Sequence, residues 1–150
     1  MSTKLPTSAP AQVPPLTVLL EAVSRSVIRR LAEQLQTKGH DLITEPHLVL
    51  LGNLDCGSTH AAQIAQRMGI SRQAVSKTLR EMQSMGYLSL EDDPARGNQK
   101  LVVMTERGRQ LAITAREELR SIEAALSKQI GAREMVALRL GLEQIWFQAI

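Results

Sequence analysis

The stretch GISRQAVSKTLREM, residues 69–82, decides the fold of this chain of 150 residues. Its apolar residues Val75, Leu79 and Met82 recur every three or four positions, which is the spacing of one face of an α-helix. The residues between them are basic, amide or hydroxyl: Arg72, Gln73, Ser76, Lys77 and Arg80. The pattern predicts a helix over residues 72–85 that has one apolar face and one face of hydrogen-bond donors and positive charge.

A second, shorter helix is predicted just before this one. It runs from about residue 59 to residue 67 with Ser58 as its cap, and it is joined through Gly69 to the helix that Ser71 caps. Ala65 leaves room for the two helices to cross closely, and Gly69 can adopt a positive φ that would strain most other residues. Two helices joined through a glycine, the second basic on its outer face, are the signature of a helix-turn-helix.

A β-hairpin is predicted directly downstream. Residues 87–90 alternate as a strand does, residues 91–99 have the composition of a turn, and residues 100–104 form the returning strand. A hairpin that follows a recognition helix can lie along the neighbouring minor groove of DNA. Arg96 at the hairpin tip and Lys100 on its returning strand suit that contact.

The basic face of the second helix fits the major groove of duplex DNA, which is about 12 Å wide and admits one α-helix. Its first turn, with Arg72 and Gln73, is the part that usually reaches base edges, whereas Lys77 and Arg80 are expected on phosphates. The free amides at the start of the preceding helix could hold a phosphate as well. The predicted DNA-binding residues are Ser58, Thr59, Ser71, Arg72, Gln73, Ser76, Lys77, Arg80, Arg96 and Lys100.

The charge distribution supports a polyanionic partner. The chain carries a net charge of +3, and residues 58–109 hold eight basic and five acidic residues, so this central third accounts for the whole excess. A concentrated basic segment indicates nucleic acid more strongly than a diffuse charge would. The only aromatic residues are Tyr87, Trp146 and Phe147, too few to stack the unpaired bases of a single strand.

Composition bounds the class of protein. Hydrophobic residues make up 43% and charged residues 22% of the chain, as in a soluble globular protein. Because Cys56 is the only cysteine, no internal disulfide can form, and the chain fits the reducing cytoplasm, where we place it. No apolar run approaches the roughly 18 residues of a membrane span. We predict no cofactor.

The remaining sequence predicts a flexible arm over residues 1–15 and one predominantly helical α+β domain over residues 16–150. Within that domain, residues 44–108 form the helix-turn-helix and hairpin. Residues 16–38 and 109–150 form the outer helices. These outer helices are apolar beyond what a small helix-turn-helix needs, so we predict that they pair two chains. The predicted dimerisation residues are Leu19, Leu20, Val23, Leu138, Leu142, Ile145, Trp146, Phe147 and Ile150.

The chain resembles the MarR (multiple antibiotic resistance regulator) family of bacterial transcription factors. The resemblance is carried by IAQRMGISRQAVSKTLREMQSMGYL, residues 64–88, and DPARGNQKLVVMTERG, residues 93–108. The second segment ends in the family's Leu-Thr-x-x-Gly junction, with Met104 in place of leucine. One departure is that the family's hairpin tip carries Asp-x-Arg where this chain has Arg96 and Asn98.

The resemblance implies a winged helix-turn-helix and a homodimer intertwined through both ends of the chain. Two recognition helices would then lie about one DNA turn apart and read a near-palindromic operator in double-stranded DNA. Family members often bind small aromatic or phenolic ligands between the dimer region and the DNA-binding lobe, which shifts the helix spacing. The implied function is a transcriptional regulator, a repressor released by such an effector.

Several alternatives stay open from sequence alone. A winged-helix module can dock a protein instead of DNA, and an outer helix face can be basic merely because it is solvated. His40, Asp41, His47 and His60 could hold a metal, although no pair has tight ligand spacing. Cys56 could sense oxidants, or act with His60 in catalysis, but no third orienting group accompanies the pair. We expect no enzymatic activity.

Overall fold

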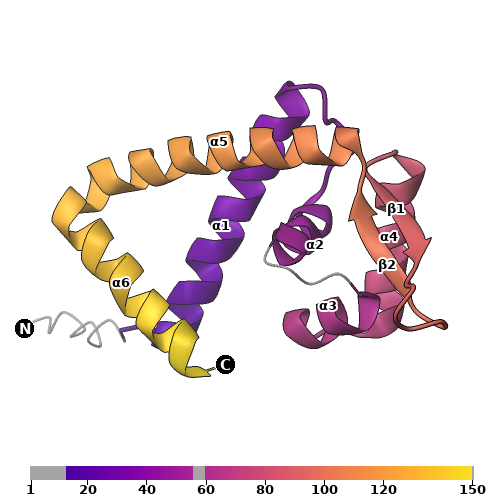
Figure 1. Ribbon diagram of the computed structural model, residues 1–150. Helices are drawn as coiled ribbons and strands as arrows, with labels where there is room; N and C mark the ends of the chain where they lie inside the picture. Colours follow the sequence, from indigo (N-terminus) through magenta and orange to yellow (C-terminus); the bar gives the residue numbers. More distant parts are fainter. Residues whose placement is uncertain (1–12, 56–59, 150) are drawn as a thin grey trace, which may run out of the picture.

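The structure is a computed structural model that describes residues 13–55 and 60–149. Figure 1 shows the order of its elements along the chain. In that order they are α1 (Leu16–Thr37), α2 (Glu45–Asp55), α3 (Ala61–Met68), α4 (Arg72–Ser84), β1 (Leu88–Asp92), β2 (Lys100–Met104), α5 (Glu106–Ile130) and α6 (Ala132–Ala149).

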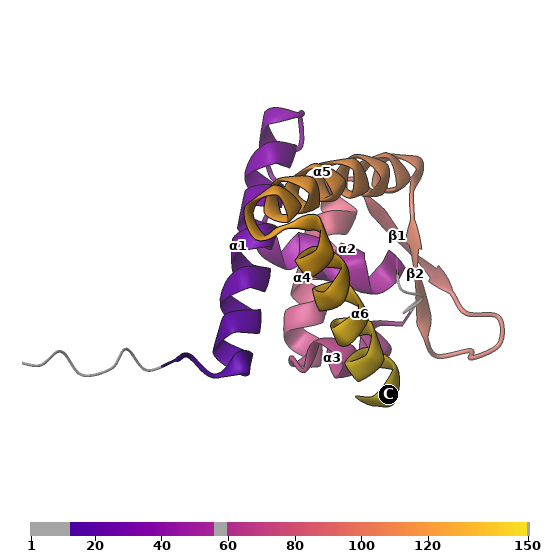
Figure 2. The ribbon, with the colours of Figure 1, turned by 90° about the vertical axis from the view of Figure 1, so that its left-hand side faces the viewer.

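The three long helices α1, α5 and α6 form a frame to which a smaller lobe is attached. Helix α5 crosses α1 and continues, past a turn at Gly131, into α6 (Figure 1). Helices α2, α3 and α4 and the hairpin make up the lobe at the other end of α5, and the loop of the hairpin projects away from the body (Figure 2). None of the described helices is long and apolar enough to cross a membrane.

One apolar core joins the frame to the lobe. Its most deeply buried side chains are Leu35, Ile43, Leu50, Ile64, Val75, Met82, Tyr87, Leu111 and Ile122. Burying one such side chain contributes about 1.5–3 kcal/mol relative to leaving it exposed. Among the described residues, α6 adds no buried side chain to this core, so its many apolar residues stay at the surface.

The start of α5 is fastened to the segment between α4 and β1. The Thr105 hydroxyl accepts a hydrogen bond from the Gly108 backbone N–H (3.1 Å) and donates one to the Gly86 carbonyl oxygen (2.6 Å). The Thr105 backbone N–H donates to the Tyr87 carbonyl oxygen at 3.1 Å. These bonds cap α5 and fix its first turn against the hairpin.

The hairpin is antiparallel, with a register that runs from Leu88 opposite Met104 to Asp92 opposite Lys100. A third segment touches its edge, because His60 forms an isolated β-bridge with Leu101. The hairpin of β1 and β2, called the wing below, is therefore linked directly to His60, the residue that precedes α3.

The predicted fold class is confirmed, and most predicted boundaries agree with the structure. The helix predicted from residue 59 instead begins at Ala61, because His60 is extended (φ −117°, ψ 141°) and occupies the N-cap position. Ser58, which we predicted as that cap, lies outside the described residues, as do Thr59 and Cys56. The first strand starts one residue later than predicted, at Leu88. The division between an arm and a domain at residue 15 stays a prediction.

Candidate nucleic-acid interface

The turn before α4 sets the direction of that helix. Gly69 closes α3 in the left-handed conformation (φ 63°), where a side chain would be strained. Ser71 then starts α4 as predicted, and its hydroxyl accepts a hydrogen bond from the Ala74 backbone N–H at 3.1 Å. Ser71 is thus the N-cap of α4, a role worth about 0.5–2 kcal/mol of helix stability.

Helix α4 divides into the two faces that the sequence predicts. Val75, Leu79 and Met82 are at most 3% exposed and pack into the core. The opposite face is open: Arg72, Gln73, Lys77 and Arg80 are exposed and Ser76 is half-buried. The buried apolar face therefore holds the helix in place, while a row of hydrogen-bond donors and cations on the other face is exposed to solvent.

Four of the predicted residues meet in one cleft. It has a volume of about 480 Å³ and lies between the start of α3, the outer side of α4 and the hairpin. Arg72, Ser76, Arg80 and Lys100 line it, over an apolar floor that includes Leu79. Three positive side chains around one cleft form a local site for anionic groups. Gln73, Lys77 and Arg96 do not line it.

Two of the predicted cations already have acidic neighbours. The Lys100 ammonium lies 2.5 Å from Asp92 Oδ1, and the Lys77 ammonium lies 3.9 Å from Glu81 Oε1. Both pairs are solvent-exposed, and such pairs are typically worth only about 0–1 kcal/mol. Either lysine can therefore be transferred to a phosphate at little cost.

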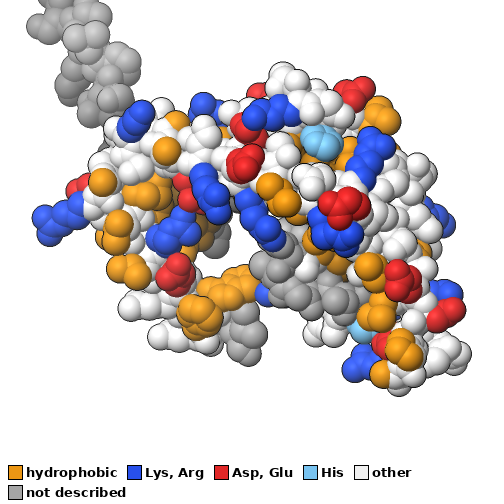
Figure 3. All heavy atoms as spheres, turned by 45° about the horizontal axis from the view of Figure 1, so that its top comes forward, with side chains coloured by type: hydrophobic (Ala, Val, Ile, Leu, Met, Phe, Trp, Pro, Cys, Tyr) orange, Lys and Arg blue, Asp and Glu red, His pale blue; other side chains and the backbone are white. Residues whose placement is uncertain are grey.

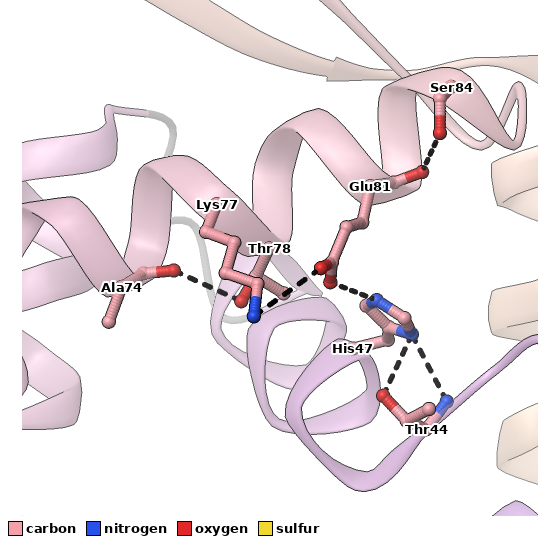
Figure 4. A network of polar contacts seen from close by, with 7 residues as sticks. All are labelled: Thr44, His47, Ala74, Lys77, Thr78, Glu81 and Ser84. Carbon is pink, nitrogen blue, oxygen red and sulfur yellow. Dashed lines mark hydrogen bonds and ion pairs between the residues drawn. The ribbon is translucent and has the colours of Figure 1, made fainter.

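A polar contact that we did not predict ties α4 to α2 (Figure 4). The Thr44 backbone N–H donates to His47 Nδ1 at 3.1 Å, so the proton is assigned to Nε2, which donates to Glu81 Oε2 at 3.0 Å. The His47 side chain is only 5% exposed, whereas that of Glu81 is 45% exposed. The one sequence signal was that Glu81 is the only acid in α4; its partner, 34 residues earlier, follows from no spacing rule.

A second such contact lies where β1 ends and the loop of the hairpin begins. His60 Nε2 is 2.8 Å from Asp93 Oδ2, and the two side chains are 12% and 8% exposed. The Ala95 backbone N–H donates to Asp93 Oδ1 at 2.8 Å. That hydrogen bond, followed by the one from His60, holds the pKa of Asp93 below its ordinary value.

The histidines are structural links within the described part of the chain. His40 Nδ1 lies 2.8 Å from the Tyr87 hydroxyl, and burial followed by the nearby Arg107 charge lowers the pKa of His40. Among residues 13–55 and 60–149, no three His, Cys, Asp or Glu side chains are grouped as metal ligands would be. His47 bonds to the carboxylate of Glu81 and His60 to that of Asp93, so each links two parts of the fold.

The predicted dimerisation residues lie on two exposed apolar surfaces. On α1, Leu19, Leu20 and Val23 are 45%, 38% and 54% exposed. On α6, Leu138, Leu142, Ile145, Trp146 and Phe147 are all exposed, and Ile150 lies outside the described residues. Figure 3 shows apolar side chains gathered at the end of the molecule that α6 forms. A groove of about 400 Å³ between α1, α5 and α6 runs beside Leu138, Leu142 and Trp146.

Helix α6 also carries an outward apolar stripe that the predicted set does not contain in full. Val136, Leu140 and Phe147 recur at helical spacing and are 58%, 54% and 78% exposed. Leu140 was missed, because the nearly continuous apolar sequence of α6 hides which side faces out. At the end of the helix, the Arg67 guanidinium carbon lies 5.3 Å from the Trp146 ring centroid, so α6 touches α3.

This geometry defines a winged helix-turn-helix protein: a capped, cationic helix stands beside a hairpin wing and is attached to a frame of long apolar helices. Residues 43–97 match the model of the MarR family. The match spans α2, the helix-turn-helix and the first part of the hairpin, and so includes much of the sequence that carries the resemblance to that family.

Solved structures of the same fold cover nearly the whole chain. MarR of Escherichia coli, without ligand, has a TM-score of 0.73 at 18% identity, over 89% of this chain and 98% of that one. A MarR family protein of Mycobacterium tuberculosis in complex with salicylic acid has a TM-score of 0.69 at 24% identity, over 89% and 98%. MepR is a transcription regulator of the Staphylococcus aureus multidrug efflux pump MepA. Its structure has a TM-score of 0.63 at 18% identity, over 91% of this chain and 99% of that one. The comparison with curated proteins gives no match.

Proposed function

We propose that this chain is a sequence-specific, double-stranded DNA-binding transcriptional regulator that acts as a homodimer and represses its target. The observation that carries the proposal is the outer face of α4, where Arg72, Gln73, Lys77 and Arg80 are exposed while the opposite face is buried in the core. A helix offered in this way fits the major groove. Arginine pairs with guanine and glutamine with adenine, so the first turn supplies base recognition.

The homodimer is supported by the uncovered apolar surfaces of α1 and α6. Apolar patches of this kind mark interaction sites on soluble proteins, because leaving them in water is unfavourable. A symmetric pair would place its two copies of α4 about one DNA turn apart on a near-palindromic operator. The wing residues Arg96 and Lys100 would lie beside each half-site, and Ser58 and Thr59 near its phosphates.

An effector site is supported by a cleft between α1, α2 and the turn that precedes α4. Its volume is about 450 Å³, and its apolar lining includes Ile28, Val49, Met68 and Ile70. Arg25 lies at its side together with the carboxylates of Glu21 and Glu45, and Arg25 is paired with Glu21. A small aromatic molecule fits these apolar walls. Binding there would release DNA if it favoured one spacing of the two α4 helices over another.

The alternative is a winged-helix module that docks a protein partner and binds no DNA. The apolar ends of the chain suit that module equally well. Docking a protein, however, gives no reason for the cationic outer face of α4. An enzyme is not expected, because the proposed regulator needs only binding and no chemical step.

The assignment within α4 is tested by Arg72→Ala. We expect it to weaken binding to a cognate duplex by ~1–3 kcal/mol and to relax the preference at one base position, because a bidentate base contact is lost. Lys77→Ala is the matched control, since it removes a cation from the same helix face and should weaken cognate and random duplexes alike. Fluorescence anisotropy with both duplexes measures the difference. An equal loss on cognate and random DNA for Arg72→Ala would show that the base-reading residue is assigned wrongly.

A further inference from the structure

The turn at the tip of the wing is organised by one residue, Asp93. Its backbone N–H donates to the Gln99 carbonyl oxygen (3.0 Å), and its carbonyl oxygen accepts from the Arg96 backbone N–H (3.2 Å). Its carboxylate accepts from the Ala95 backbone N–H. The Gln99 backbone N–H returns to the Arg96 carbonyl oxygen at 2.8 Å. The backbone of Arg96 is thus fixed on both sides, and its side chain is left exposed.

Asp93 is itself held from outside the wing. The only carboxylate oxygen that the turn does not use, Oδ2, lies 2.8 Å from His60 Nε2, and Asp93 is 7% exposed. His60 is placed by its backbone, which pairs with Leu101 on β2, and by Gln63, whose Oε1 lies 3.2 Å from His60 Nδ1. The wing turn is therefore anchored to the start of α3.

We propose that His60 is a positioning residue for the wing: through Asp93 it holds the turn that presents Arg96 to DNA. This inference rests on the proposed function and adds the residue on which the wing contact depends. Arg96 stands nine positions before Thr105, and Asn98 is two residues further along the same turn. A turn that is fixed before binding holds the single arginine of the wing in place for its contact.

The physical reason is the entropy of an exposed loop. Ordering one backbone residue costs about 1–2 kcal/mol, and a loose turn would incur that cost for several residues when it meets DNA. An anchored turn has already been ordered by folding, so more of the Arg96 contact remains as binding free energy. His60 thus affects affinity without touching DNA.

A double-mutant cycle tests this positioning role. The chains are wild type, His60→Ala, Arg96→Ala and the double variant, and the probe is a duplex that wild type selects from random DNA. We expect His60→Ala and Arg96→Ala each to weaken binding about tenfold, and His60→Ala to add less than about twofold once Arg96 is gone. A merely structural role would instead give the same loss in both backgrounds, and that result would overturn the proposal. So would an Arg96→Ala chain that binds as wild type does.

Three further measurements keep the test decisive. His60→Gln retains a donor near Asp93 and should recover most of the affinity; if His60→Ala fails to fold, Asp93→Ala replaces it in the cycle. Asp92→Ala removes the same charge as Asp93→Ala from the adjacent position, so it should not show the coupling to Arg96. Without DNA, amide exchange at Ala95 and Gln99 should accelerate in His60→Ala, and unchanged exchange would contradict the anchor.

Failure of the inference differs from failure of the proposed function. A folded wild-type chain that binds no duplex at low salt would overturn the proposed function and, with it, the presentation of Arg96 to DNA. A wild-type chain that binds, with His60 and Arg96 uncoupled, would overturn the positioning role alone.

Discussion

Leu138→Glu should split the proposed dimer into single chains and lower the affinity for a palindromic duplex by about 10²–10⁴-fold. Leu138 is 47% exposed on α6 beside the apolar groove, so a glutamate there remains hydrated in a single chain. In a pair of chains the same carboxylate would be buried without a partner, which is costly. Two linked half-site contacts bind DNA more tightly than one contact does, by about 10²–10⁴-fold, because the second contact forms within the same complex.

Analytical ultracentrifugation at micromolar concentration measures the first effect, and anisotropy with the duplex measures the second. Gln144→Glu is the matched control, since it adds the same charge to an exposed position of α6 that is not apolar. We expect the control to stay dimeric and to bind as wild type does. If Leu138→Glu remained dimeric and kept full affinity, α6 would not form the interface in the way proposed.

Gly108→Ala should destabilise the fold by about 3 kcal/mol or more. A Cβ atom at Gly108 would lie 2.1 Å from the Tyr87 carbonyl oxygen and 3.1 Å from its carbonyl carbon. Backbone atoms cannot move aside without breaking the hydrogen bond between that oxygen and the Thr105 N–H. Overpacking of this kind typically costs about 1–3 kcal/mol, and more where the obstacle is rigid.

Urea denaturation followed by circular dichroism gives the change in the free energy of unfolding. Gly52→Ala serves as the control, because Gly52 lies within α2 and a Cβ atom there would meet nothing within 4 Å. It should stabilise the chain by about 0.5–1 kcal/mol, since alanine favours a helix over glycine. A Gly108→Ala chain as stable as wild type would mean that the start of α5 does not pack against Tyr87 in this way.

Local sequence signals were sufficient for most of the fold. Ser71 is a cap, and Gly69, Gly86 and Gly131 interrupt apolar periodicities, so most elements could be placed to within one or two residues. The start of α3 could not be placed, because the extended conformation of His60 depends on its pairing with Leu101, a residue 41 positions later. A local signal says nothing of such a partner.

The candidate site was predictable in one respect and not in another. The cationic face of α4 follows from helical periodicity, since a helix whose apolar side is buried must expose the rest. The polar links that hold this face could not be predicted, because His47 and His60 bond to Glu81 and Asp93, which are 34 and 33 residues away. Taken alone, each histidine is equally consistent with an exposed surface position.

The central claim is that the cationic face of α4 binds double-stranded DNA, and that each chain of a symmetric dimer contributes one such helix. It is tested most directly by the affinity of the wild-type chain for a self-selected duplex at 50 and 200 mM salt. A dimer that uses 6–10 phosphate contacts should lose about 10³–10⁵ in affinity between these concentrations, because each contact releases bound counterions. A folded chain that binds no duplex at 50 mM salt, or binds equally at both concentrations, would contradict the account.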